Sequence, residues 1–148
     1  MRMNDGNSDQ KFGKIHAAHA GYLTRYLAEC RRACDGDLDL FLVMAIIGER
    51  TFSERCAPEA MSIEAFVGGT VGRVEALPIN LQSISEFTGI PRETVRRKLE
   101  ILIQKGWIRR DDRKYMTATD KANLAFLSLT KITQKYLRDL ASALNRSS

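Results

Sequence analysis

The chain has 148 residues with a formal net charge of +5, and 44% of its residues are hydrophobic. This is long enough for one domain with a hydrophobic core, and too apolar for a disordered chain. The longest apolar run, residues 40–47, is far shorter than the roughly 20 residues of a membrane span. Residues 1–10 lack the basic and apolar regions of a secretory signal, and three cysteines are too few for a secreted disulfide framework. We therefore expect a cytoplasmic protein.

The first part of the chain predicts two helices. Residues 1–10 are polar and without periodicity, which is typical of a disordered tail. Over about 10–34, apolar side chains recur every three or four positions, which predicts a helix of about six turns. Asp35-Gly36-Asp37 should end this helix and cap a second one over 38–52. Because residues 40–47 are apolar all round, we expect the second helix at the centre of the structure.

The middle of the chain begins with its least regular segment. Residues 57–79 are interrupted by glycine and proline, and we expect a short helix near 61–67. The run 68–72, Gly-Gly-Thr-Val-Gly, lacks the spacing and the lysine of a phosphate-binding loop. Asn80 is a good N-cap for a helix over 81–88, which Gly89 should end. Pro91 fits the first turn of a further helix that runs to about 105, before Gly106.

The last part predicts a hairpin followed by a long helix. Residues 107–110 and 113–117 are strand-like, and Asp111-Asp112 between them suits a tight turn. Asp120 should cap a helix of about six turns to Leu144. The apolar stripe of that helix gives a candidate dimer interface, made of Phe126, Leu129, Ile132, Tyr136 and Leu140.

Positive charge is concentrated in one window of the sequence. Residues 91–114 hold nine basic and four acidic residues, a net charge of +5 that equals the charge of the whole chain. A solvated helix face usually mixes both signs evenly. The imbalance indicates an anionic partner.

Two short helices around a glycine turn, followed by a basic hairpin, predict a winged helix-turn-helix. Residues 84–99, ISEFTGIPRETVRRKL, resemble the helix-turn-helix of the Crp/Fnr family of bacterial transcription regulators, above all in Thr-Gly-x-x-Arg-Glu-Thr-Val-x-Arg. Leu99, Leu102, Gly106 and Ile108 continue the pattern. The resemblance covers about 80–117. The sequence departs from the family because the preceding residues are too few and too helical for its β-rich sensor domain. Helices on both sides of the wing resemble the MarR family in architecture alone.

The resemblance implies a role for individual side chains. An arginine fork suits the O6 and N7 acceptors of guanine, and a glutamate suits the amino group of cytosine. The residues that would contact bases are Arg92, Glu93 and Arg97. Those that would contact the DNA backbone are Gln82, Ser83, Thr94 and Arg96, together with Arg109, Arg110, Arg113 and Lys114 on the wing.

Other chemistries find little support in the sequence. His16, His19, Cys30 and Cys34 share one helical face, but His19 and Cys30 are eleven residues apart, about 16 Å along a helix. This distance is too long for one metal ion, so we expect no metal and no cofactor. Redox sensing by Cys30 or Cys34 would require a lowered thiol pKa. No nucleophile has a base and an orienting partner, so we do not expect an enzyme.

The sequence thus predicts a mainly α protein, a winged helix-turn-helix with a short β-hairpin wing and long N- and C-terminal helices. The regions are a tail at 1–10, helices for core and dimerisation at 11–56, a connecting segment at 57–79, the DNA-binding region at 80–117, and a dimerisation helix at 118–148. We expect a homodimeric regulator that binds specific sequences in double-stranded DNA. A winged helix that binds a protein or RNA is the alternative, and a small-molecule effector stays an open question.

Overall fold

A computed structural model describes residues 11–52, 60–68 and 77–146. The elements in chain order are α2 (Phe12–Ala33), α3 (Leu38–Thr51), α4 (Ile63–Val67), α5 (Leu81–Thr88), α6 (Arg92–Gln104), β1 (Ile108–Arg110), β2 (Met116–Ala118), α7 (Asp120–Ala125) and α8 (Leu127–Asn145). The strands β1 and β2 form an antiparallel hairpin in which Arg109 pairs with Thr117. The mainly α fold class with a hairpin wing is confirmed.

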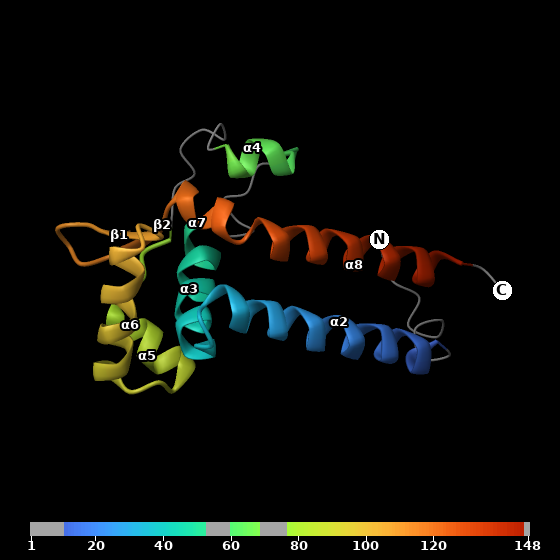
Figure 1. The fold of residues 1–148 in the computed structure, drawn as a ribbon, viewed down its shortest axis with the longest axis horizontal. Helices are drawn as coiled ribbons and strands as arrows, with labels where there is room; N and C mark the ends of the chain where they lie inside the picture. The colour runs from blue at the N-terminus through green and yellow to red at the C-terminus, as the bar shows by residue number, and fades with distance from the viewer. Residues whose placement is uncertain (1–10, 53–59, 69–76, 147–148) are drawn as a thin grey trace.

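The molecule consists of a head and an arm (Figure 1). The head contains α3, α5, α6 and the hairpin, with α7 beside them. The arm is the antiparallel pair α2 and α8, which lie side by side and extend together from the head. At the far end of the arm, Lys11 Nζ donates a hydrogen bond to the carbonyl oxygen of Arg146. The two long helices predicted at the ends of the chain therefore pack against each other.

Helix α3 lies at the centre of the head, as its apolar surface predicts. Val43 and Ile47 are completely buried. Contacts join α3 to α2, α5, α6 and β2. The hydrophobic core also includes Ile84 of α5 and Leu99 of α6, both buried. The burial is not complete all round the helix, although the apolar run predicted this, because Leu38 is 43% and Leu42 39% exposed on the side of α3 that has no neighbour. The buried side of α3 still supplies much of the hydrophobic stabilisation of the head.

Local signals explain where the helices begin and end. The side chain of Asn80 accepts a hydrogen bond from the backbone N–H of Ser83, and Asp37 caps α3 by accepting from the N–H of Leu40. Gly89 ends α5 at φ +74°, in the left-handed region that disfavours side chains. Pro91 differs from its prediction because it precedes the helix. Its ψ of 141° is extended, so α6 begins one residue later.

The last helix also differs from its prediction, since it is divided at Phe126. The backbone there, at φ −102° and ψ 17°, ends α7 and begins α8 in a new direction. The ring of Phe126 packs edge-on against Trp107 and Phe41, with centroids 4.8 and 5.8 Å apart. Apolar spacing of three and four continues through the break, which is why periodicity alone did not reveal it.

We expect Leu99→Ala to lower the free energy of unfolding by about 3 kcal/mol, because it leaves a cavity in the core at a side chain only 1% exposed. Ile101→Ala is the matched control on the same helix. Its side chain is 37% exposed, and its loss should cost less than about 1 kcal/mol. Urea denaturation followed by circular dichroism measures both changes. Equal losses would place Leu99 outside the core.

Candidate nucleic-acid interface

The helix-turn-helix is held together by buried side chains and by bonds across its turn. Ile84 of α5 and Val95 of α6 are completely buried. Within the turn, Ser85 Oγ donates to the carbonyl oxygen of Ile90 at 2.7 Å, and the N–H of Ile90 donates to Thr88 Oγ1 at 3.1 Å. The angle between the two helices is therefore fixed by packing and by hydrogen bonds together.

The outer face of α6 presents a compact group of charged side chains. The buried side of α6 consists of Val95, Leu99 and Leu102. The side chains expected to contact bases lie in solvent, and these are Arg92, Glu93 and Arg97. Arg96 belongs to the same exposed face. The structure thus brings Glu93, Arg96 and Arg97 together on the outer side of α6, and it places Arg92 in solvent at the first residue of the same helix.

Glu93 is the centre of that group. Its carboxylate accepts hydrogen bonds from Arg96 Nε at 3.0 Å and Arg96 Nη2 at 2.7 Å, and Arg97 Nε lies 3.4 Å from Oε1. The hydrogen bonds and positive charge of Arg96, followed by the charge of Arg97, lower the pKa of Glu93 to about 2. Glu93 is therefore ionised at any physiological pH and can only accept hydrogen bonds. Arg92 has no acidic partner among the residues that the structure describes.

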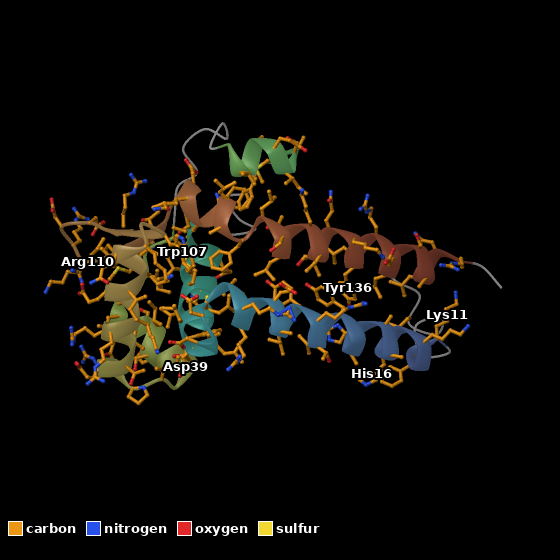
Figure 2. All side chains as sticks on the ribbon, in the orientation of Figure 1. Lys11, His16, Asp39, Trp107, Arg110 and Tyr136 are labelled. Atoms are coloured by element: carbon orange, nitrogen blue, oxygen red, sulfur yellow. The ribbon has the colours of Figure 1, made fainter. Side chains whose placement is uncertain are left out.

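The wing is shaped by Asp111. Its carboxylate accepts hydrogen bonds from the backbone N–H groups of Arg113 and Tyr115, both at 2.9 Å, and Lys114 adopts a left-handed φ of +64°. The four basic side chains of the wing are exposed, and these are Arg109, Arg110, Arg113 and Lys114. One of them differs from the others, because Arg110 lies 3.5 Å from Glu100 of α6 and braces the wing against that helix (Figure 2).

The start of α5 offers weaker support for backbone contacts. Gln82 and Ser83 are exposed, but Gln82 Nε2 donates to Glu86, and the N–H and hydroxyl of Ser83 both bond to the Asn80 side chain. Thr94 is half-buried. These side chains would have to exchange present partners for phosphate oxygens.

Two basic residues in the charged window have structural roles. Lys98 is half-buried and pairs with Asp37, the cap of α3. Burial raises the pKa of Asp37, but the bonds from Lys98 and Leu40 outweigh burial and lower it overall. Lys105 pairs with Asp35 at 3.3 Å and lies over the Trp107 ring. Counting charges along the sequence could not separate these lysines from the exposed arginines.

The histidines and cysteines of α2 take part in hydrogen bonding and packing. His19 Nδ1 lies 2.8 Å from the Tyr136 hydroxyl, and no group of metal-ligating side chains occurs within the described ranges. Cys30 and Cys34 are buried, and burial raises the pKa of each thiol to about 11. This contradicts the lowered pKa that redox sensing would require, and Cys56 lies outside the described residues. No described helix is long and apolar enough to cross a membrane.

Comparison with known families finds a match to the part of the head that follows α3. The family model of the Crp-like helix-turn-helix domain matches residues 58–127, from before α4 to the first residue of α8. No curated protein and no solved structure matches the chain. Residues 58–127 therefore match a Crp-like helix-turn-helix domain, which supports a DNA-binding regulator in general. The resemblance seen in the sequence is confirmed, and the match extends further in both directions.

The wider match has a structural counterpart in α4. This short helix contacts α7, and the Asn123 side chain donates a hydrogen bond to the carbonyl oxygen of Phe66 at 3.3 Å. The rings of Phe66 and Phe52 pack edge-on with centroids 5.4 Å apart. The described part of the segment predicted as a connection thus packs against the head.

We expect Cys30 and Cys34 to react slowly with iodoacetamide in the folded protein. With a pKa of about 11, only about one thiol in a thousand is ionised near pH 8, against roughly a tenth or more for an ordinary thiol. Mass spectrometry of a Cys56→Ser variant should show at least about 100-fold slower alkylation in native buffer than in concentrated guanidinium chloride. The native rate should rise about tenfold per pH unit from pH 8 to 10. Equal native and denatured rates would contradict the burial of these thiols.

Proposed function

We propose that the protein is a transcription regulator that binds specific DNA sequences, with α6 in the major groove. The observation that carries the proposal is the exposure of Arg92, Glu93 and Arg97 on α6, where Arg92 stands at the first turn and Glu93 and Arg97 face away from the buried stripe. A recognition helix needs this arrangement, because one side must pack on the head while the other reaches base edges. Acting on chromosomal DNA, such a regulator would work in the cytoplasm.

Glu93 supplies a physical basis for specificity. Its carboxylate holds the guanidinium groups of Arg96 and Arg97 before DNA arrives, which limits their rotamer freedom. An ionised carboxylate near phosphates is unfavourable unless it meets a donor, and the amino group of cytosine is such a donor. Glu93 therefore weakens binding to DNA sites that lack cytosine at the base pair it contacts. Arg97 favours guanine at a neighbouring base pair.

The remaining cations position the protein on the duplex. On the wing, Arg109, Arg113 and Lys114 have no acidic partner among the described residues, so their charges are free for phosphates or the minor groove. Arg96 and Thr94 on α6, with Gln82 and Ser83 on α5, would add backbone contacts. Arg110 would contribute less than its neighbours, because Glu100 already neutralises part of its charge.

We also infer that two copies pair through the arm, which supports binding to a two-fold symmetric site. Side chains of the stripe first expected to form the interface contact the chain itself: Leu129 is 3% exposed, and the Tyr136 ring stacks on Tyr22 with centroids 3.9 Å apart. On the arm, the large apolar side chains that remain exposed are Phe12, Leu23 and Leu27 on α2 and Leu137 on α8, between 41% and 63% exposed. A pair of helices leaves each helix without a second neighbour, and a second arm would cover these side chains.

A protein-binding or RNA-binding winged helix remains the competing function. A protein-binding scaffold has no need for an Arg-Glu-x-x-x-Arg face beside a wing with free cations. Competition between duplex DNA and structured RNA distinguishes the RNA alternative directly.

Selection from sheared bacterial genomic DNA at physiological salt tests base reading. Wild-type protein should recover fragments that share a motif with two half-sites, and the Arg92→Ala/Arg97→Ala variant should lose that motif. Arg97→Ala alone should weaken binding to the selected site by about 1–3 kcal/mol and relax the preference at one base pair. Recovery of fragments without any shared motif would reduce the interaction to charge attraction.

The wing variant Arg113→Ala/Lys114→Ala is the matched comparison, since it removes the same number of charges. It should keep the motif, weaken binding to every sequence, and reduce the dependence on salt by about one to two phosphate contacts. A change in the motif itself would mean that the wing reads bases.

Dimerisation is tested by Leu27→Asp, which places a charge on the exposed apolar side of the arm. Sedimentation should show a dimer for the wild type and a monomer for this variant, because a buried unpaired charge is strongly unfavourable. Leu124→Asp is the control: its side chain is 60% exposed on α7, outside the arm, and the dimer should persist. A monomeric wild type, or a dimeric Leu27→Asp protein with an unchanged circular dichroism spectrum, would contradict this interface.

A further inference from the structure

The arm carries as much net positive charge as the whole chain. Helices α2 and α8, residues 12–33 and 127–145, hold seven basic and two acidic residues, a net charge of +5 that equals that of the protein. Both acidic side chains are already used, because Glu29 pairs with Arg32 and Asp139 pairs with Lys135. The arm therefore has an excess of cations that its folding does not require, since like charges on paired helices repel.

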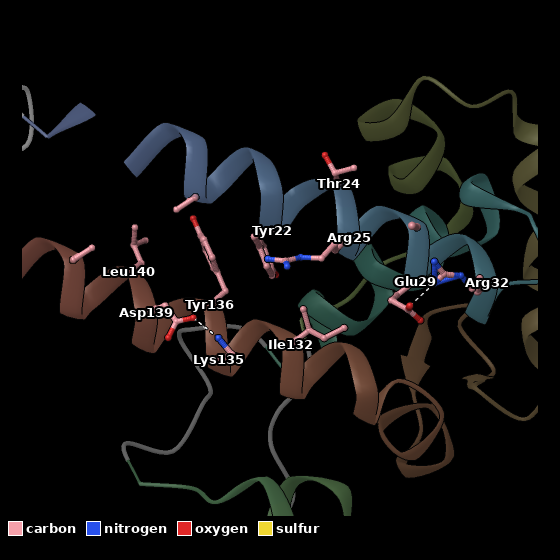
Figure 3. Close-up of a pocket in the computed structure, with 13 residues that line it drawn as sticks. Tyr22, Thr24, Arg25, Glu29, Arg32, Ile132, Lys135, Tyr136, Asp139 and Leu140 are labelled. Atoms are coloured by element: carbon pink, nitrogen blue, oxygen red, sulfur yellow. Dashed lines mark hydrogen bonds and ion pairs between the residues drawn. The ribbon is translucent and has the colours of Figure 1, made fainter. Parts of the chain in front are cut away.

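A groove lies between the two helices of the arm (Figure 3). Its volume is about 680 Å³, within the range of sites for small organic ligands. The lining reaches from Ala18 to Arg32 along α2, about 21 Å at the helical rise. Tyr22 of α2 and Tyr136 of α8 stack on each other there, beside Ile132 and other apolar side chains. An apolar body of aromatic size would be covered on two sides.

Arg25 is the cation in the groove that has no acidic partner. Arg32 and Lys135, which also line it, are neutralised by Glu29 and Asp139, whereas no ion pair involves Arg25 within the described part of the chain. Figure 3 shows Arg25 on the α2 wall near Tyr22, with no dashed line to a neighbour. A planar guanidinium beside aromatic rings is a suitable partner for a carboxylate, which it can bind through two hydrogen bonds.

The groove and the exposed apolar side of the arm face different directions. Leu23 and Leu27 are each two positions from Arg25, and two positions turn an α-helix by about 200°. The same spacing separates Leu137 from Lys135 on α8. Leu137 accordingly lines a different hollow, the one near Tyr26 and Phe41 at the base of the arm. Pairing of two arms through their leucines would leave the charged groove open.

We propose that this groove binds a small organic anion, a carboxylate on an apolar body. The carboxylate pairs with Arg25, and the apolar body lies against Tyr22, Tyr136 and Ile132. The pairing of Glu29 and Asp139 with their own cations keeps these acids from competing for Arg25. A nucleic acid fits less well, because its charges are spread along a polar backbone and gain nothing from the apolar lining. The site involves none of the residues proposed to contact DNA.

The fluorescent anion 8-anilinonaphthalene-1-sulfonate (ANS) is a suitable probe, since it combines one negative charge with an aromatic body. The full-length wild-type protein should bind one ANS per chain saturably, and Arg25→Gln should weaken that binding roughly tenfold or more. N-phenyl-1-naphthylamine, a related neutral dye, should bind both proteins equally. Benzoate and decanoate should displace ANS better than benzamide and decanol, and their ranking separates aromatic from aliphatic bodies.

Arg31→Gln is the matched control, because Arg31 is an exposed cation on α2 that does not line the groove. It should leave ANS affinity unchanged. An equal loss for Arg31→Gln and Arg25→Gln would reduce the effect to overall charge, and absence of saturable ANS binding would also overturn the site. Loss of ANS binding in Leu27→Asp but not in Arg25→Gln would assign the dye to the exposed apolar side of the arm and overturn the site.

Displacement of ANS by duplex DNA would make the arm a nucleic-acid surface instead. None of these outcomes changes the result of the genomic selection, so the two proposals fail independently.

Discussion

The burial of α3 is the constraint on which the rest of the structure depends. The buried residues of this helix, among them Val43 and Ile47, need several neighbours at once, while Leu38 and Leu42 on the opposite side stay partly exposed. In this protein α5 and α6 contact it together with β2, and α2 contacts it from the arm. The same helix therefore supports both α6 and α2, the first helix of the arm. Substitutions that shrink α3 would disturb both, whereas those on the outer face of α6 would change only what the head can bind.

Several acidic residues near the interface have a defined structural task. Asp37 caps α3 and pairs with Lys98 of α6, and Asp35 pairs with Lys105. Glu93 holds two arginines on the open face, and Glu100 holds Arg110 of the wing. The cations left over are those that a polyanion can reach. Among the described residues, a positive surface of this kind has two classes of cation: unpaired ones such as Arg92, Arg109, Arg113 and Lys114, and Arg96 and Arg97, which Glu93 holds in fixed positions. Fixed and free charges together favour defined contacts over general adhesion.

The sequence was informative wherever a local rule decides the structure. Asn80 specifies a cap and Gly89 a turn through their own chemistry. The apolar run of α3 predicted a central helix, although it did not show that Leu38 and Leu42 stay exposed. Phe126 was not predictable, because its break preserves the periodicity and is set by Trp107 and Phe41, which are distant in sequence. The roles of Lys98, Lys105 and Arg110 depend in the same way on partners brought close by folding. Nor could the groove of the arm be foreseen, because it exists only once α2 and α8 lie together.

The junctions between arm and head are short and closely bonded, which bears on how a dimer would meet DNA. At one junction, the Gly36 N–H donates to Arg31 O at 2.7 Å and the Asp37 N–H to Cys34 O at 3.0 Å. At the other, Phe126 packs against Trp107, which precedes the first strand of the wing and lies where head and arm meet (Figure 2). Neither connection behaves as a flexible linker, because each is fixed by hydrogen bonds or ring packing. In a dimer, the geometry of the paired arms would then set the distance between the two copies of α6. A half-site spacing other than one helical turn of DNA would therefore indicate a different pairing of the arms, with the head itself unchanged.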